Sequence, residues 1–227
     1  MKGLVLAALL STAATSAYGN DLFVNQIGED LTLTVTQDGT GNTIGDDVTA
    51  LTLNGNDMTF TIEQQGDNNV ISAIINGNTY TGEWQFIGNN NTVDLTCDSL
   101  GQAQCEVVTV DIFTTGSDNT YNVYIGEAKI ADNLLVSFDV SGDGNIINAN
   151  LDATNADVTI IIDNAGGLGN TFNIDQDDAG SVDGHSLAVD HTGGNSTFNI
   201  IQSGLVDKII NIVSFGDNQV VNITQTD

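Results

Sequence analysis

One polar position recurs along this chain at a nearly constant spacing, and this repeat constrains the fold more than any other feature. The position lies three residues after a turn glycine and returns eight times. In chain order it is occupied by Asn42, Asn69, Asn91, Asn119, Asn145, Asn170, Ser196 and Gln219. Seven intervals separate the first from the last, so the period is about 25 residues. Such a period is typical of solenoids, in which each unit buries its apolar face against its neighbours.

Apolar and polar residues alternate on both sides of each turn. The second unit, for example, reads Phe60-x-Ile62-x-Gln64 before its turn and Asn69-x-Ile71 after it. Alternation over runs of this length predicts β-strands with one buried face. Two such strands joined by a turn of Gly, Asn and Asp residues form one strand–turn–strand rung.

The pattern therefore predicts an all-β chain folded as a β-solenoid of about eight stacked rungs. The single solenoid domain would occupy residues 31–227, and residues 20–30 would form an N-terminal segment or an extra strand. A sandwich of ordinary hairpins is the alternative. It is disfavoured because a sandwich does not require the same residue types at equivalent positions of every unit.

Composition agrees with a long sheet stack and excludes one class of partner. The chain has no proline, which would remove hydrogen-bond donors from a sheet, and 25 glycines, which suit tight corners. It has 30 acidic residues and only 3 basic ones. Nucleic acid is therefore excluded as a partner, because phosphate binding needs clustered Lys and Arg.

The N-terminus has the features of a secretory signal peptide. Lys2 precedes a short apolar run at residues 3–10, and Ala17 and Gly19 place small residues before a cleavage site. We expect residues 1–19 to be the signal peptide and the mature chain to be secreted, either extracellular or at the cell surface. The apolar run is too short to span a membrane. In an exported chain, Cys97 and Cys105, the only cysteines, are expected to form a local disulfide.

Amide side chains share the inward face of the strands with Ile, Val and Phe. Buried amides are costly unless they are hydrogen bonded, and in a stack each can bond to its equivalent one rung away. The predicted ladder consists of Gln37, Asn42, Gln64, Asn69, Asn91, Asn119, Asn145, Asn170, Gln176, Gln202, Gln219 and Gln225.

These positions resemble the repeat of the curlin family, the subunits of curli fibres. That repeat reads Gln-x-Gly-x-x-Asn, with a further Gln six residues after the Asn. The opening motif appears here as Gln37-Asp-Gly39-Thr-Gly-Asn42 and again from Gln64 to Asn69. The closing Gln appears as Gln176, Gln202 and Gln225. The resemblance covers residues 21–227.

The resemblance implies a structural subunit that stacks head to tail into extracellular, amyloid-like fibres for adhesion or a biofilm matrix. It also implies secretion and nucleation helper proteins as partners. The middle units depart from the repeat, since Phe86, Thr114 and Val140 stand at Gln positions. The first two and last three units match best, which favours the two ends as the interface between subunits. The departures leave open a minor or nucleating subunit, or a monomeric solenoid acting as an adhesin or virion-surface binding module.

The sequence offers no catalytic constellation and no cofactor site, so we expect no enzyme. His191 falls at an inward position where other units have Gln, and His185 is expected in a loop. Calcium has weak candidate ligands in one acidic stretch, Asp175, Asp177, Asp178 and Asp183. They lack the spacing of an EF-hand, so a solvated acidic loop is preferred and an ion-binding surface protein is a third hypothesis.

Overall fold

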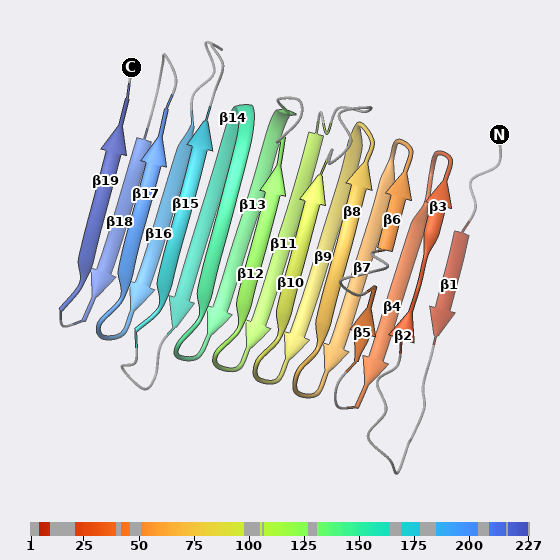
Figure 1. Cartoon of the computed structure of the whole chain (residues 1–227), viewed down its shortest axis with the longest axis horizontal. Helices are drawn as coiled ribbons and strands as arrows, with labels where there is room; N and C mark the ends of the chain where they lie inside the picture. Colours follow the sequence, from red (N-terminus) through yellow and green to blue (C-terminus); the bar gives the residue numbers. More distant parts are fainter. Residues whose placement is uncertain are drawn as a thin grey trace.

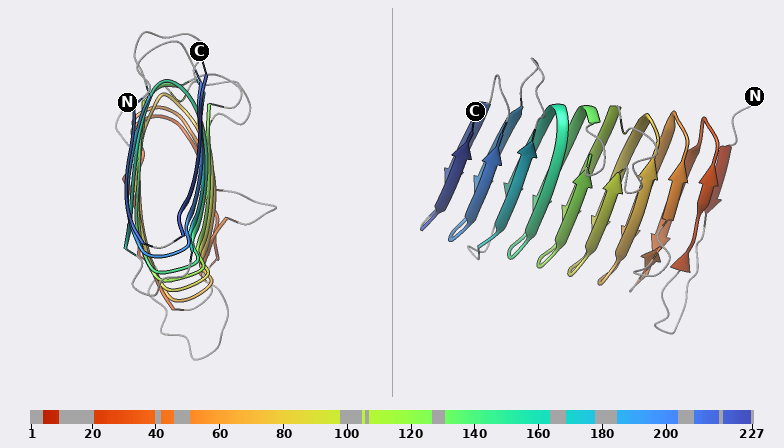
Figure 2. Two further views of the ribbon diagram at one scale, coloured as in Figure 1. Left: turned by 90° about the vertical axis from the view of Figure 1, so that its left-hand side faces the viewer. Right: turned by 45° about the horizontal axis from the view of Figure 1, so that its top comes forward.

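The computed structural model describes residues 5–9, 21–39, 42–45, 51–97, 105, 107–126, 131–163, 169–177, 185–203, 209–216 and 218–226. The strands in these ranges form two facing layers, called sheet A and sheet B here, and neighbouring strands in each sheet are parallel (Figure 1). Seen along the stack, the two layers close into a flattened oval (Figure 2). The described residues contain no helix long and apolar enough to cross a membrane.

Each sheet takes its strands alternately from the chain. Sheet A contains β1 (Val5–Leu9), β4 (Thr32–Asp38), β7 (Met58–Gln65), β9 (Thr79–Ile87), β11 (Val107–Thr115), β13 (Ala131–Ser141), the second part of β14 (Ile146–Asp163), β16 (Ser186–Thr192) and β18 (Ile209–Phe215). Sheet B contains β2 (Asp21–Leu22), β3 (Asn25–Ile27), β5 (Thr43–Ile44), β6 (Leu51–Asn54), β8 (Val70–Asn76), β10 (Thr92–Cys97), β12 (Thr120–Ile125), the first part of β14, β15 (Thr171–Asp177), β17 (Thr197–Gln202) and β19 (Val220–Gln225).

A rung is one strand of sheet A followed by the next strand of sheet B. The first full rung is β4 with β5 and β6, the last is β18 with β19, and the described strands make eight such rungs. This confirms the predicted β-solenoid. In the middle, β14 runs without interruption from sheet B into sheet A, so its 18 residues serve two successive rungs. The small side chains of Ala153 and Ala156 lie buried where it turns the corner.

The core fills the space between the sheets and follows the alternation of the sequence. Strand β9, for example, buries every second residue, including Tyr80, Trp84 and Phe86. Aromatic rings contact one another between rungs: the Phe172 and Phe198 rings are stacked with centroids 4.7 Å apart. Burial of this kind removes apolar surface from water in each rung only because a neighbouring rung covers it.

Glycine stacks on glycine at the turn that joins the two strands of a rung. Gly66, Gly88 and Gly116 have φ of 130°, 147° and 152°, a region that favours glycine. A Cβ added to Gly88 would lie 1.8 Å from the carbonyl oxygen of Gly66, and one added to Gly116 would lie 1.7 Å from that of Gly88. Any side chain at Gly88 or Gly116 would therefore overlap the backbone of the preceding rung.

The two ends of the solenoid are covered differently. At the N-terminal end, β1 pairs with β4, and it lies inside the predicted signal peptide. Cleavage after Gly19 would remove β1 and free that edge of β4. Strands β2 and β3, from the predicted 20–30 segment, pair with β5 and β6 in sheet B. At the other end, no strand in the described part of the chain follows β18 and β19.

Candidate functional site

Glutamine side chains form two short rows inside the solenoid. In the first row, Gln64 Nε2 donates to Gln37 Oε1 at 2.6 Å. In the second, Gln202 Nε2 donates to Gln176 Oε1 at 2.7 Å, and Gln225 Nε2 donates to Gln202 Oε1 at 3.4 Å. In every case the later rung donates to the earlier one, so the rows have a direction along the stack.

The first row stops where the sequence departs from its repeat. Phe86 lies beside Gln64 in the next rung, and Thr114 and Val140 follow in the same column. Gln64 Oε1 is buried and accepts no hydrogen bond from any residue that the structure describes. An unpaired buried acceptor is unfavourable, so this interruption reduces the stability that the row contributes.

The asparagine column uses a different bond from the one expected. Asn69 Oδ1 accepts a hydrogen bond from the backbone N–H of Asn42 at 3.1 Å, and Asn91 Oδ1 accepts one from that of Asn69 at 3.1 Å. The Nδ2 group of Asn69 donates to the carbonyl of Gly66 in its own turn at 2.7 Å. The Asn69 amide thus holds its own turn and also binds the backbone of the preceding rung, and Asn91 and Asn145 do the same. The other members of the column with the same Oδ1 bond are Asn119, Asn145 and Asn170.

Side-chain-to-side-chain bonding is the exception in this column. Asn119 Nδ2 donates to Asn145 Oδ1 at 3.0 Å. At the C-terminal end, Gln219 replaces Asn, and its Nε2 donates to the carbonyl of Gly193 at 2.9 Å. The expected ladder of like amides therefore describes the Gln rows, whereas the Asn column is mainly a series of side-chain-to-backbone clamps.

His191 and Ser196 replace Gln and Asn in the seventh rung and bond to each other. His191 Nε2 lies 2.7 Å from Ser196 Oγ, and His191 Nδ1 lies 3.1 Å from Ser214 Oγ in the last rung. The ring is buried, and burial lowers the pKa of His191 against a weaker opposing effect of the Asp190 carboxylate. His185, expected in a loop, is buried directly before β16.

Protonation of His191 is expected to destabilise the last two rungs. Because its pKa is lowered in the folded chain, the unfolded chain binds more protons as the pH falls below about 6.5, and folding stability falls with it. Replacing His191 by glutamine should remove this contribution. We expect the melting temperature of the wild type, relative to His191→Gln, to fall between pH 7.5 and pH 5. A difference in melting temperature between the two proteins that stays constant across this pH range would contradict the prediction.

A further polar row lies on the outside of sheet B, and the sequence analysis missed it. It runs along one column of outward positions, with each amide donating to the preceding rung: Asn122 to Asp94 at 2.6 Å, Asn148 to Asn122 at 2.8 Å, Asn173 to Asn148 at 2.7 Å, Asn199 to Asn173 at 2.8 Å and Asn222 to Asn199 at 3.0 Å. The signal was present as the central Asn of the repeated triplets beginning at Phe172, Phe198 and Val221. Alternation places these residues in solvent, where water can satisfy an amide and no ladder is required.

The disulfide and the acidic stretch occupy separate parts of the solenoid. Cys97, at the end of β10, is joined to Cys105, and both are buried. Asp175 and Asp177 lie on β15, whereas Asp178 and Asp183 lie outside the described residues. Among the residues that the structure describes, no three His, Cys, Asp or Glu side chains are grouped so that they could hold a metal ion.

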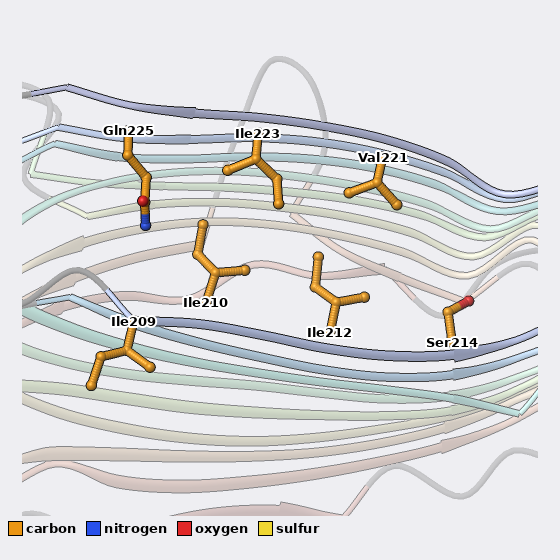
Figure 3. Close-up of a pocket in the computed structure, with 7 residues that line it drawn as sticks. All are labelled: Ile209, Ile210, Ile212, Ser214, Val221, Ile223 and Gln225. Atoms are coloured by element: carbon orange, nitrogen blue, oxygen red, sulfur yellow. The ribbon is translucent and has the colours of Figure 1, made fainter.

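The C-terminal end is an open hollow, and all but one of the residues that line it have buried equivalents in the preceding rung. Its volume is about 750 Å³, and Figure 3 shows Ile210, Ile212, Val221 and Ile223 extending into the space between β18 and β19. Ile223 is 47% exposed, whereas Ile200, at the same position one rung earlier, is 1% exposed. The last rung is therefore a core layer without the next layer that would cover it.

Comparison of the chain with protein-family models, with curated proteins and with solved structures gives no match.

Proposed function

We propose that this chain is a secreted structural subunit that stacks end to end into extracellular, amyloid-like fibres of the curli type. The observation that carries the proposal is the uncovered core layer at β18 and β19, which presents apolar side chains and unpaired strand edges together. Soluble solenoids normally close such an end with a polar cap, because an open edge invites another strand.

The register of the repeat continues across a junction between two copies. If β18 of one copy paired with β4 of the next, Ile212 would take the place beside Val35, and Ile210 the place beside Leu33. These pairings follow from the column positions that each residue holds within one chain. Apolar side chains of one copy would contact apolar side chains of the next. Each side chain that becomes fully buried contributes roughly 1 kcal/mol or more to the free energy of association.

Full contact in sheet B requires the short strands β2 and β3 to leave the edge of β5 and β6. Their strand pairs comprise five residues, Asp21, Leu22, Asn25, Gln26 and Ile27, and backbone bonds at Val24, Gly28 and Asp30 add to them. The incoming β19 offers a six-residue strand for the same edge. In a fibre, this uninterrupted strand would take the place of the two short ones.

Fibre formation is tested on residues 20–227 by thioflavin fluorescence, electron microscopy and fibre diffraction. We expect seedable fibres with a meridional spacing of about 4.8 Å along their axis. A stable β-rich monomer at all concentrations would instead favour the second candidate, a solenoid that acts as a binding module.

An inward carboxylate in the open layer should stop growth without unfolding the subunit. Ile212 is only partly buried, so Ile212→Asp leaves the carboxylate hydrated in the free chain, but stacking would bury it without a partner. We expect the elongation rate to fall at least tenfold. The matched control is Val213→Asp, an outward residue of the same strand that is 42% exposed. Equal elongation rates for the two variants would show that this end is not the junction.

A further inference from the structure

The two outer faces of the solenoid differ sharply in charge. The outward side chains described on sheet A between β4 and β16 include eight carboxylates: Asp38, Glu63, Glu83, Asp111, Asp139, Asp157, Asp163 and Asp190. The outward side chains described on sheet B include three, Asp94, Asp152 and Asp175. Two copies that approach through sheet A would therefore bring rows of like charge together, whereas sheet B avoids most of this repulsion.

The outer face of sheet B is also an ordered array. Its middle column is the row from Asp94 to Asn222, in which side chains of neighbouring rungs are hydrogen bonded to each other. The flanking column on one side repeats threonine, at Thr92, Thr120, Thr171 and Thr197. Side chains fixed in this way lose little conformational entropy when a partner covers them.

Apolar side chains lie at intervals among these polar columns. Ile146 is 38% exposed and Ile201 is 44% exposed, and Val220 extends the pattern into the last rung. Flat sheet faces that combine amide rows with small polar and apolar side chains pack face to face as dry, interdigitated layers. The most suitable counterpart for such a face is another face with the same repeat along its length.

We propose that the outer face of sheet B, from β8 to β19, pairs with the same face of a second copy of this chain. This face is about 30 Å wide across its seven strands, and each strand is about 20 Å long. Pairing would therefore bury roughly 600 Å² of each copy. The total of about 1,200 Å² lies at the lower limit of standard interfaces. One pair of subunits would associate weakly, and in two fibres lying side by side the contacts of successive subunits would add.

The proposal is independent of end-to-end stacking. Substitutions on sheet B and on sheet A distinguish specific pairing through sheet B from a general effect of charge. Thr120 and Thr171 point outward from sheet B, and Thr109 and Thr159 point outward from sheet A in the same two rungs, all with intermediate exposure. One double variant carries both Thr120→Glu and Thr171→Glu on sheet B. Its control carries both Thr109→Glu and Thr159→Glu on sheet A. Both add the same charge, so a general effect of net charge would be equal in the two.

Pairing is measured by sedimentation velocity on freshly dissolved residues 20–227, and by filament width in electron micrographs once fibres are present. We expect the sheet B variant to weaken pairing at least tenfold and to give single filaments, and the sheet A control to match the wild type. The Ile212→Asp variant should still pair side by side, which separates this result from fibre growth. Equal effects of the two double variants, or a wild type that never pairs, would overturn the proposal.

A charge-swap experiment guards against variants that merely fold poorly. The variant Thr120→Lys with Thr171→Lys changes the same two positions but adds positive charge, so mixing it with the Glu variant should restore the pairing that the Glu variant alone has lost. Failure of the mixture to pair, with both variants giving wild-type circular dichroism spectra, would overturn the proposal. A wild type that stays unpaired but co-sediments with an insoluble polysaccharide would also overturn it, and loss of that binding in the sheet B Glu variant alone would assign the face to carbohydrate.

Discussion

Replacing Gly116 by alanine is expected to destabilise the native solenoid severely. The new Cβ would lie 1.7 Å from the carbonyl oxygen of Gly88, which belongs to the backbone of the neighbouring rung and cannot rotate away. Relief requires the two rungs to separate locally, and this breaks the clamp from Asn91 N–H to Asn119 Oδ1 at 2.8 Å beside the turn. We expect a loss of more than about 4 kcal/mol in the free energy of unfolding, measured by urea titration.

Gly39→Ala provides the control for this experiment. Gly39 has φ of 136°, so alanine there carries a similar conformational cost. Among the described residues, its Cβ would meet only Asn42 Oδ1, at 3.9 Å, which is an ordinary contact. The difference in stability between the two variants therefore isolates the overlap between rungs. Similar unfolding midpoints for Gly116→Ala and Gly39→Ala would contradict the tight glycine stacking.

The same Gly39→Ala variant is expected to fold and yet to fail in fibre growth. In the free chain the side of Gly39 that faces a preceding rung is open, but in a fibre Gly216 of the neighbouring copy would stack there. Within one chain, a Cβ on Gly216 would lie 1.5 Å from the carbonyl oxygen of Gly193, which shows how closely this column is packed. We expect the elongation rate from wild-type seeds to fall more than tenfold.

Seeded growth followed by thioflavin fluorescence checks this result, and Asp38→Ala serves as the control. Asp38 is exposed and directly precedes Gly39, so its removal changes the same turn without adding a Cβ to the stacked column. A Gly39→Ala protein that elongates as fast as Asp38→Ala would exclude the first turn from the junction. The proposed function would then need an interface elsewhere.

Much of the architecture was predictable because the stack imposes one rule on every rung. The alternation placed Gln37 and Gln64 inward in one column, and the structure pairs them. The same alternation puts Trp84, Phe138, Phe172 and Phe198 at inward positions, and all four are buried. These features depend on period and register, and both are properties of the sequence itself.

The bonding of individual amides was not predictable in the same way. The Asn69 side chain turns to Gly66 and to the Asn42 backbone because the turn conformation brings both groups within reach. The outward row through Asn148 was missed for a related reason. Alternation decides which face a residue occupies, but only the spacing between neighbouring strands shows that exposed amides on successive rungs lie close enough to bond. Strand β14 was also unexpected, since no glycine marks its corner at residues 153–156.

The uniformly parallel pairing of the strands makes the two ends of the solenoid chemically different surfaces. A head-to-tail contact between such ends is heterologous, has no two-fold axis and never closes on itself, so a filament built from it is polar. One tip would always display β18 and β19, and the other would always display β4. A subunit blocked at one surface only could join through its intact surface and then act as a chain terminator. Traces of Gly39→Ala protein would thus stop one tip of a growing filament, and traces of Ile212→Asp protein would stop the other.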